Sequence, residues 1–183
     1  MLDEKKIISI SGTHGTGKST LAYSLCTRLK HIGKNVRVLD EIARKCPFPI
    51  NQEGTKQSQV WMICEQIVCE MELIKQGYDY VIVDRSIMDP YAYGRALNVI
   101  SEHFEVEVIT DHIAHYYKKI YVPDKDKCDY QFYDGIREIE DQDFRNNVYY
   151  QLLQAYEKFG INYKIIEHPI EVYRELDVEW VNI

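Results

Sequence analysis

The segment that decides the fold is IISISGTHGTGKS, residues 7–19, which joins a short apolar run to a glycine-rich turn. Its last eight residues fit the pattern G-x-x-x-x-G-K-[ST], and a helical pattern follows. In such a turn the backbone N–H groups point inward, and the positive end of the next helix faces the same point. The segment therefore predicts a phosphate cradle made of Gly12, Thr13, His14, Gly15, Thr16, Gly17, Lys18, Ser19 and Thr20.

Two side chains of this cradle carry specific expectations. Lys18 is placed to reach the β- and γ-phosphates of a nucleoside triphosphate, which makes it a candidate catalytic residue. The hydroxyl of Ser19 is the expected ligand of Mg²⁺. The expected cofactors are thus Mg²⁺ and ATP, and GTP remains an alternative to ATP.

The rest of the chain alternates β-rich runs with helical patterns, which predicts an α/β fold with a parallel sheet. Strands are expected at 7–11, 36–39, 80–84, 119–122 and 163–167, and helices at 18–32, 53–76, 90–100, 105–118, 140–159 and after Pro169. In the helix at 53–76, Val60, Cys64, Ile67, Val68, Met71 and Ile74 recur at helical spacing. We expect them to form a buried stripe, although the same stripe would also suit a homodimer.

The composition limits the class of protein. With 183 residues the chain fits one domain, and its formal net charge of −7 disfavours non-specific binding to nucleic acid. There is no apolar run long enough to span a membrane. The five cysteines include no CxxC pair, so we interpret them as reduced thiols, mostly small buried hydrophobic residues, in a cytoplasmic protein.

Acidic and basic side chains follow two of the predicted strands. Asp84 ends the strand at 80–84 and Arg85 follows it, and Asp40 and Glu41 follow the strand at 36–39. The carboxyl ends of parallel strands meet at one edge of a sheet, where the phosphate cradle also lies. We expect Asp84 to hold Mg²⁺ and Arg85 to neutralise charge on a transferred phosphoryl group. Glu41 is preferred as the base, with Asp40 and Asp84 left open.

A segment of about 124–146 is the candidate lid over this edge. Its first part, 124–136, is irregular and rich in Asp, Lys and Tyr, and long irregular loops often close over a site. Arg137 is the first candidate and Arg145 the second for contact with the triphosphate. No HxxxH or HxH pair occurs with cysteines at metal-binding spacing, so we predict no zinc site. We expect His112 and His115, three residues apart, on a solvated helix face.

These motifs resemble those of a known group of enzymes. The cradle and the run DRSIMDPYAYG, residues 84–94, are similar to the deoxynucleoside kinase and thymidylate kinase superfamily. The run DEIAR, residues 40–44, resembles the acidic strand end of the AAA-like P-loop kinases related to the ribosylnicotinamide kinase domain, and DGIR, residues 134–137, resembles the lid element of that group. The resemblance covers about residues 7–167.

The resemblance implies a three-layer P-loop fold: a five-stranded parallel sheet of order 2-3-1-4-5 with a helical lid. It also implies transfer of a γ-phosphoryl group to a small nucleoside- or nucleotide-like acceptor. By position, Glu41 would be the acceptor-side base or ligand, Arg85 would contact phosphates and Arg137 would come from the lid. Two alternatives stay open: a kinase acting on a nucleic-acid 5′-hydroxyl end, and a P-loop ATPase that serves as a regulatory binding module.

Overall fold

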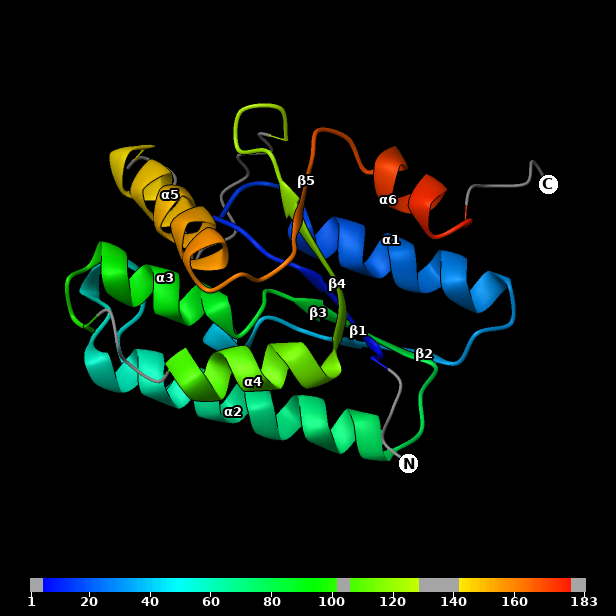
Figure 1. Cartoon of the computed structure of the whole chain (residues 1–183), viewed down its shortest axis with the longest axis horizontal. Coiled ribbons are helices and arrows are strands. Elements are labelled where there is room, and N and C mark those ends of the chain that lie inside the picture. Colours follow the sequence, from blue (N-terminus) through cyan, green and yellow to red (C-terminus); the bar gives the residue numbers. More distant parts are fainter. Residues whose placement is uncertain (1–4, 102–105, 129–141, 179–183) are drawn as a thin grey trace.

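A five-stranded parallel sheet forms the centre of the computed structural model, which describes residues 5–101, 106–128 and 142–178. The strands are β1 (Ile7–Ile10), β2 (Val36–Leu39), β3 (Tyr80–Asp84), β4 (Tyr117–Pro123) and β5 (Lys164–Ile166). Their order in the sheet is β2-β3-β1-β4-β5 (Figure 1). The expected fold class and strand order are therefore confirmed.

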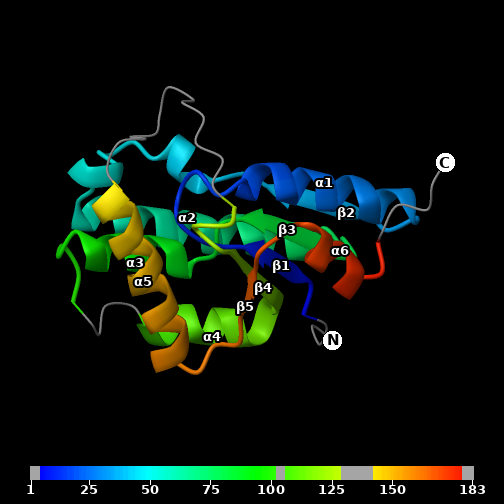
Figure 2. The same ribbon diagram turned by 90° about the horizontal axis from the view of Figure 1, so that it is seen from above.

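Helices cover both faces of this sheet. On one face, α1 (Lys18–His31) and α6 (Ile170–Glu175) enclose a hydrophobic cluster with Ile8, Ile10 and Ile82. The other face carries the larger cluster, which packs under α2 (Lys56–Lys75), α3 (Met88–Ala96), α4 (Val106–Tyr116) and α5 (Gln142–Lys158). Figure 2 shows the same layers from above. All residues of β1 are fully buried because the central strand has helices on both sides.

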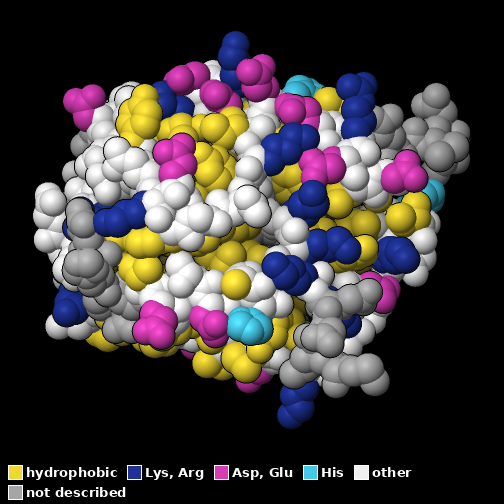
Figure 3. All heavy atoms as spheres, viewed as in Figure 1, with side chains coloured by type: hydrophobic (Ala, Val, Ile, Leu, Met, Phe, Trp, Pro, Cys, Tyr) yellow, Lys and Arg dark blue, Asp and Glu magenta, His cyan; other side chains and the backbone are white. Residues whose placement is uncertain are grey.

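The inward face of α2 differs from the predicted stripe. Val60, Ile67 and Ile74 are only partly buried, whereas Cys64, Val68 and Met71 are exposed, the last two by 52% and 48%. The helix turns Met62 and Ile63 inward together with four polar side chains, Ser58, Gln59, Gln66 and Glu70. In Figure 3, hydrophobic atoms accordingly reach the surface along the lower edge, where Figure 1 places α2 and α4. The predicted stripe was wrong because polar partners, not only apolar ones, line the neighbouring elements.

Two further local expectations need correction. His112 is buried, with 5% of its surface exposed, whereas His115 lies at the surface as expected. The loop after β2 forms two short 3₁₀ turns, Ile42–Lys45 and Asn51–Glu53, that the sequence pattern did not indicate. α2 starts at Lys56, three residues later than predicted, because Thr55 caps it through a reciprocal pair of hydrogen bonds with Ser58.

The sheet brings the candidate residues to one edge. β1 leads into the glycine-rich turn, β2 into Glu41, and β3 ends at Asp84. The parallel register pairs Ile10 with Asp84 and Leu39 with Val83, so the three strands end side by side. None of the helices in the described part of the chain is long and apolar enough to cross a membrane.

Candidate active site

The turn between β1 and α1 is shaped by glycine. Gly15 and Gly17 have φ values of 74° and 73°, which favour glycine because it has no Cβ. Gly17 occupies the position before α1, and no side chain caps the helix there. The helix N-terminus therefore keeps its positive end directed toward the turn, as a phosphate site requires.

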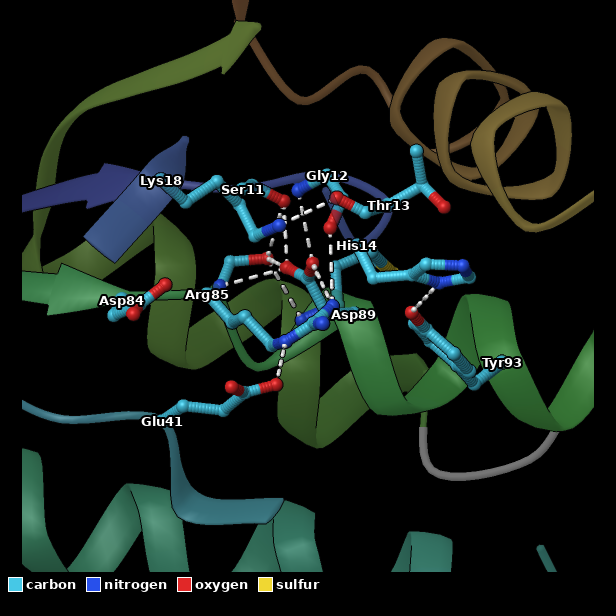
Figure 4. A network of polar contacts seen from close by, with 12 residues as sticks. Ser11, Gly12, Thr13, His14, Lys18, Glu41, Asp84, Arg85, Asp89 and Tyr93 are labelled. Carbon is cyan, nitrogen blue, oxygen red and sulfur yellow. Dashed lines mark hydrogen bonds and ion pairs between the residues drawn. The ribbon is translucent and has the colours of Figure 1, made fainter. Parts of the chain in front are cut away.

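Lys18 lies inside this turn. Its Nζ donates a hydrogen bond to the carbonyl oxygen of Thr13, 2.5 Å away, and only 3% of the residue is exposed (Figure 4). Burial, reinforced by the nearby positive charge of Arg85, lowers the pKa of Lys18 to about 7. The carboxylates of Asp84, Glu41 and Asp89 oppose this shift. The cost of burying the ammonium group beside Arg85 thus exceeds the stabilisation from these three carboxylates.

Ser19 and Asp84 form a pair whose chemistry fits a metal ion. The Ser19 hydroxyl donates to Oδ2 of Asp84, while Oδ1 is buried without a hydrogen-bond partner among the described residues. Burial raises the pKa of Asp84, and the charge of Lys18 counteracts this effect. A hydroxyl beside an under-satisfied carboxylate offers the hard oxygen ligands that Mg²⁺ prefers. The residues present therefore fit the expected magnesium site.

Arg85 and Glu41 form a buried ion pair next to the turn. Nε of Arg85 donates to Oε1 of Glu41 at 2.5 Å, and NH1 donates to the carbonyl oxygen of Gly12 at 3.0 Å (Figure 4). Burial disfavours the charge of Arg85, but Glu41 and the nearby Asp89, Asp84 and Tyr93 together outweigh it and raise the pKa of Arg85 above its usual value. Arg44 lies 3.4 Å from the other Glu41 oxygen. Asp40, by contrast, is exposed and accepts from Tyr23.

Asp89, which the sequence analysis did not single out, connects the turn to α3. Its carboxylate accepts from the backbone N–H of Gly12 at 2.9 Å, the hydroxyl of Ser11 at 2.6 Å and the backbone N–H of Ser86 at 2.7 Å. Arg85 NH1 lies 3.5 Å from the same carboxylate. The only signal in the sequence is its place in the run at residues 84–94, four residues after Arg85.

A hydroxyl from α5 completes this network. Tyr156 OH lies 2.8 Å from Oγ of Ser11 and 2.7 Å from Oγ of Ser86, and the tyrosine is fully buried. It ties the start of the turn, the start of α3 and α5 together. Each of these hydroxyls has a partner, as buried polar groups require.

Arg145, a buried residue of α5, contacts the backbone of the turn. Its Nε donates to the carbonyl oxygen of His14 at 3.2 Å, and NH2 donates to the carbonyl oxygen of Lys125 at 2.9 Å. The ring of His14 also lies 3.4 Å from Tyr93 OH. Arg137 and most of the predicted lid lie outside the described residues.

Beside Arg85 and Glu41 lies a pocket between the loop after β2, α2 and α3. Its apolar wall comprises Ile42, Ala43, Ile50, Met62 and Pro90. Gln59 also lines it, and its buried Oε1 has no hydrogen-bond partner among the described residues. The pocket therefore has an ionic end at Arg85 and Glu41 and apolar sides.

Comparison with known proteins agrees with this fold. Thymidylate kinase from Ehrlichia chaffeensis has a TM-score of 0.68 and 19% identity, covering 93% of this chain and 98% of that one. Deoxyadenosine kinase from M. mycoides with bound dATP has a TM-score of 0.58 and 14% identity, covering 94% and 99%. At such identities the likeness concerns the fold. No curated protein matches the chain. A family model described as an AAA domain matches residues 7–172, so the chain belongs to the AAA domain family.

Proposed function

We propose that residues 1–183 form one kinase domain, which uses Mg²⁺ and ATP or GTP to phosphorylate a nucleoside- or nucleotide-like small molecule. The observation that carries this proposal is the position of the Arg85–Glu41 pair. Arg85 bonds the Gly12 carbonyl of the phosphate turn on one side and lines the pocket with Glu41 on the other. A triphosphate and an acceptor would thus meet at one buried arginine. The fold shared with a thymidylate kinase and a deoxyadenosine kinase supports it.

In this mechanism the chain positions the reactants and supplies charge. Lys18 would exchange the Thr13 carbonyl for phosphate oxygens and regain its full charge. Arg85 would face the charge that develops on the transferred group. Ser19 and Asp84 would hold Mg²⁺, which neutralises phosphate charge. Arg145 would fix the turn through the carbonyl of His14.

Glu41 is the residue that we propose for the acceptor side. It is buried, lines the pocket and is held by Arg85, whereas Asp40 is exposed. Its carboxylate would accept a hydrogen bond from the acceptor hydroxyl and orient that hydroxyl toward the phosphate. Arg137 remains our candidate for the lid arginine.

The pocket supports an acceptor with a flat, partly polar ring. Its apolar walls would pack against the faces of a ring, and the side chain of Gln59 lies among the polar residues that would face the ring edge.

The test is a transfer assay with labelled ATP and GTP against nucleosides, nucleoside monophosphates, nicotinamide riboside and 5′-hydroxyl oligonucleotides. We expect a small acceptor to be labelled, and Lys18→Ala to lower kcat by about 10²- to 10³-fold. Lys30→Ala, an exposed lysine on the same helix, is the matched control and should stay within about twofold.

Two results would contradict the proposal. Full activity of Lys18→Ala would show that the phosphate turn does not serve the reaction. Hydrolysis of ATP with no labelled acceptor would favour the regulatory ATPase, and labelling of oligonucleotides alone would favour the end kinase.

A further inference from the structure

A buried polar cluster lies next to the backbone of Arg85. Its centre is Glu70 of α2, which is fully buried. The carboxylate of Glu70 accepts from Gln66 Nε2 at 2.8 Å and from Tyr117 OH at 2.7 Å, and it lies 2.7 Å from His112 Nε2. The cluster thus joins α2, α4 and β4.

Two of its members end on the backbone around Arg85. Gln66 Nε2 donates to the carbonyl oxygen of Arg85 at 2.9 Å, and the backbone N–H of Ile87 donates to Tyr117 OH at 3.2 Å. Both bonds act on the connection between β3 and α3, which carries the arginine. The cluster therefore fixes a backbone segment as well as satisfying its own members.

That backbone segment is strained. Arg85 has a φ of 86°, in the left-handed region that a residue with a side chain adopts at a cost of roughly 1–2 kcal/mol. The direction of its Cα–Cβ bond, and hence the reach of its guanidinium toward Glu41 and Gly12, depends on this conformation. A hydrogen bond to the Arg85 carbonyl stabilises the conformation directly.

Apolar side chains in place of Glu70 and His112 would fill the same space without the cost of burying a carboxylate. Burial of a carboxylate is unfavourable unless each of its oxygens is hydrogen-bonded. Here both Glu70 oxygens have partners. Neither Glu70, His112 nor Tyr117 lines the pocket beside Glu41, so these three make no contact with an acceptor bound there.

We propose that Glu70, acting through Gln66 and Tyr117 and together with His112, is a positioning residue for Arg85. The cluster holds the β3–α3 connection in the left-handed conformation that directs the guanidinium at the phosphate turn. This inference rests on the role given to Arg85 in the proposed function. It adds to that function a set of buried residues, of which Gln66 also lines the pocket.

The first test compares two buried tyrosines of β4. Tyr117→Phe removes the hydroxyl that bonds Glu70 and Ile87, and Tyr121→Phe removes a hydroxyl on the other hydrophobic cluster. We expect Tyr117→Phe to lower kcat about tenfold with less than a twofold change in either KM, because Arg85 acts on the transition state. Tyr121→Phe should leave kcat and both KM values unchanged. Equal effects of the two variants on kcat would overturn the proposal.

A double-mutant cycle separates positioning from stability. In an Arg85→Ala background, Tyr117→Phe should reduce kcat by less than twofold further, because the group that it positions is gone. A further tenfold loss in that background would contradict the proposal. Glu70→Gln, whose amide can still bond Gln66, Tyr117 and His112, should stay within about threefold of the unmodified protein.

Arginine side-chain NMR gives a readout that needs no activity. The Nε–H signal of Arg85, assigned through Arg85→Lys, should move in Tyr117→Phe and stay in Tyr121→Phe at a temperature where both variants are folded. A signal that stays in both would overturn the positioning role. If the signal moves as expected but no acceptor is phosphorylated, the proposed function fails and the positioning role stands.

Discussion

The protonation state of Lys18 should change when a nucleotide binds. With a pKa of about 7 in the ligand-free protein, this lysine is mostly neutral at pH 8. Phosphate oxygens of a bound nucleotide stabilise the ammonium form and raise its pKa again. Binding at pH 8 should therefore take up close to one proton, and the affinity for a nucleoside diphosphate in EDTA should fall as the pH rises from 7 to 9.

Calorimetry in two buffers of different ionisation enthalpy measures that proton. Lys18→Arg is the matched control, because a guanidinium keeps its charge over this range and should bind without proton uptake. Equal proton uptake by both proteins would show that another group titrates.

Among single residues, the sequence motifs predicted four members of the site but missed Asp89. Lys18, Ser19, Asp84 and Arg85 were predicted to gather because each follows a recognisable strand. Asp89 was missed as a member of the site: it meets Gly12, a residue 77 positions away, and no local pattern encodes that contact. Single-sequence reasoning identifies a residue by its neighbours in the chain, whereas this carboxylate acts through neighbours in space.

At the scale of elements, α2 was predicted as a helix with the wrong face inward. Helical spacing of apolar residues indicated the helix, but its buried side carries Gln59, Gln66 and Glu70. These residues serve the pocket and the backbone of the β3–α3 connection. An inward polar face cannot be recognised until its partners are known, which explains why the positioning cluster escaped the sequence analysis.

The N-terminal cap of α2 gives a prediction at this scale. Thr55 and Ser58 satisfy each other's backbone N–H groups, so Thr55→Ala should lower the free energy of unfolding by about 1 kcal/mol. For a chain of this size that is a fall in Tm of roughly 2–4 °C. Thr27→Ala, at an exposed position inside α1, should change Tm by less than about 1 °C. A similar Tm for both variants in thermal unfolding would contradict the capping role.

At the scale of the whole molecule, the order of the strands could be predicted because the family resemblance implied it. The contacts that α3 and α5 make with the phosphate turn could not be predicted. β1, β2 and β3 end at one edge, and α3 and α5 reach that edge through Asp89, Tyr156 and Arg145. A ligand in the phosphate turn would thus contact a segment that leads into α1 on one face of the sheet and is tied to α3 and α5 on the other. Binding should therefore stabilise the fold as a unit rather than one loop.

Because nucleotide binds the folded state, the Tm of the protein should rise when nucleotide is added. At a concentration of Mg²⁺–ATP about 100 times its Kd, the folded state gains about 2.7 kcal/mol, or roughly 5–11 °C in Tm. With EDTA the shift should shrink, since Oδ1 of Asp84 then keeps no partner among the described residues. Asp84→Asn should give the same small shift with and without Mg²⁺. Asp111→Asn, an exposed acid on α4, should retain the full effect. A shift that is independent of Mg²⁺ in the unmodified protein would show that no metal beside Ser19 and Asp84 contributes to nucleotide binding.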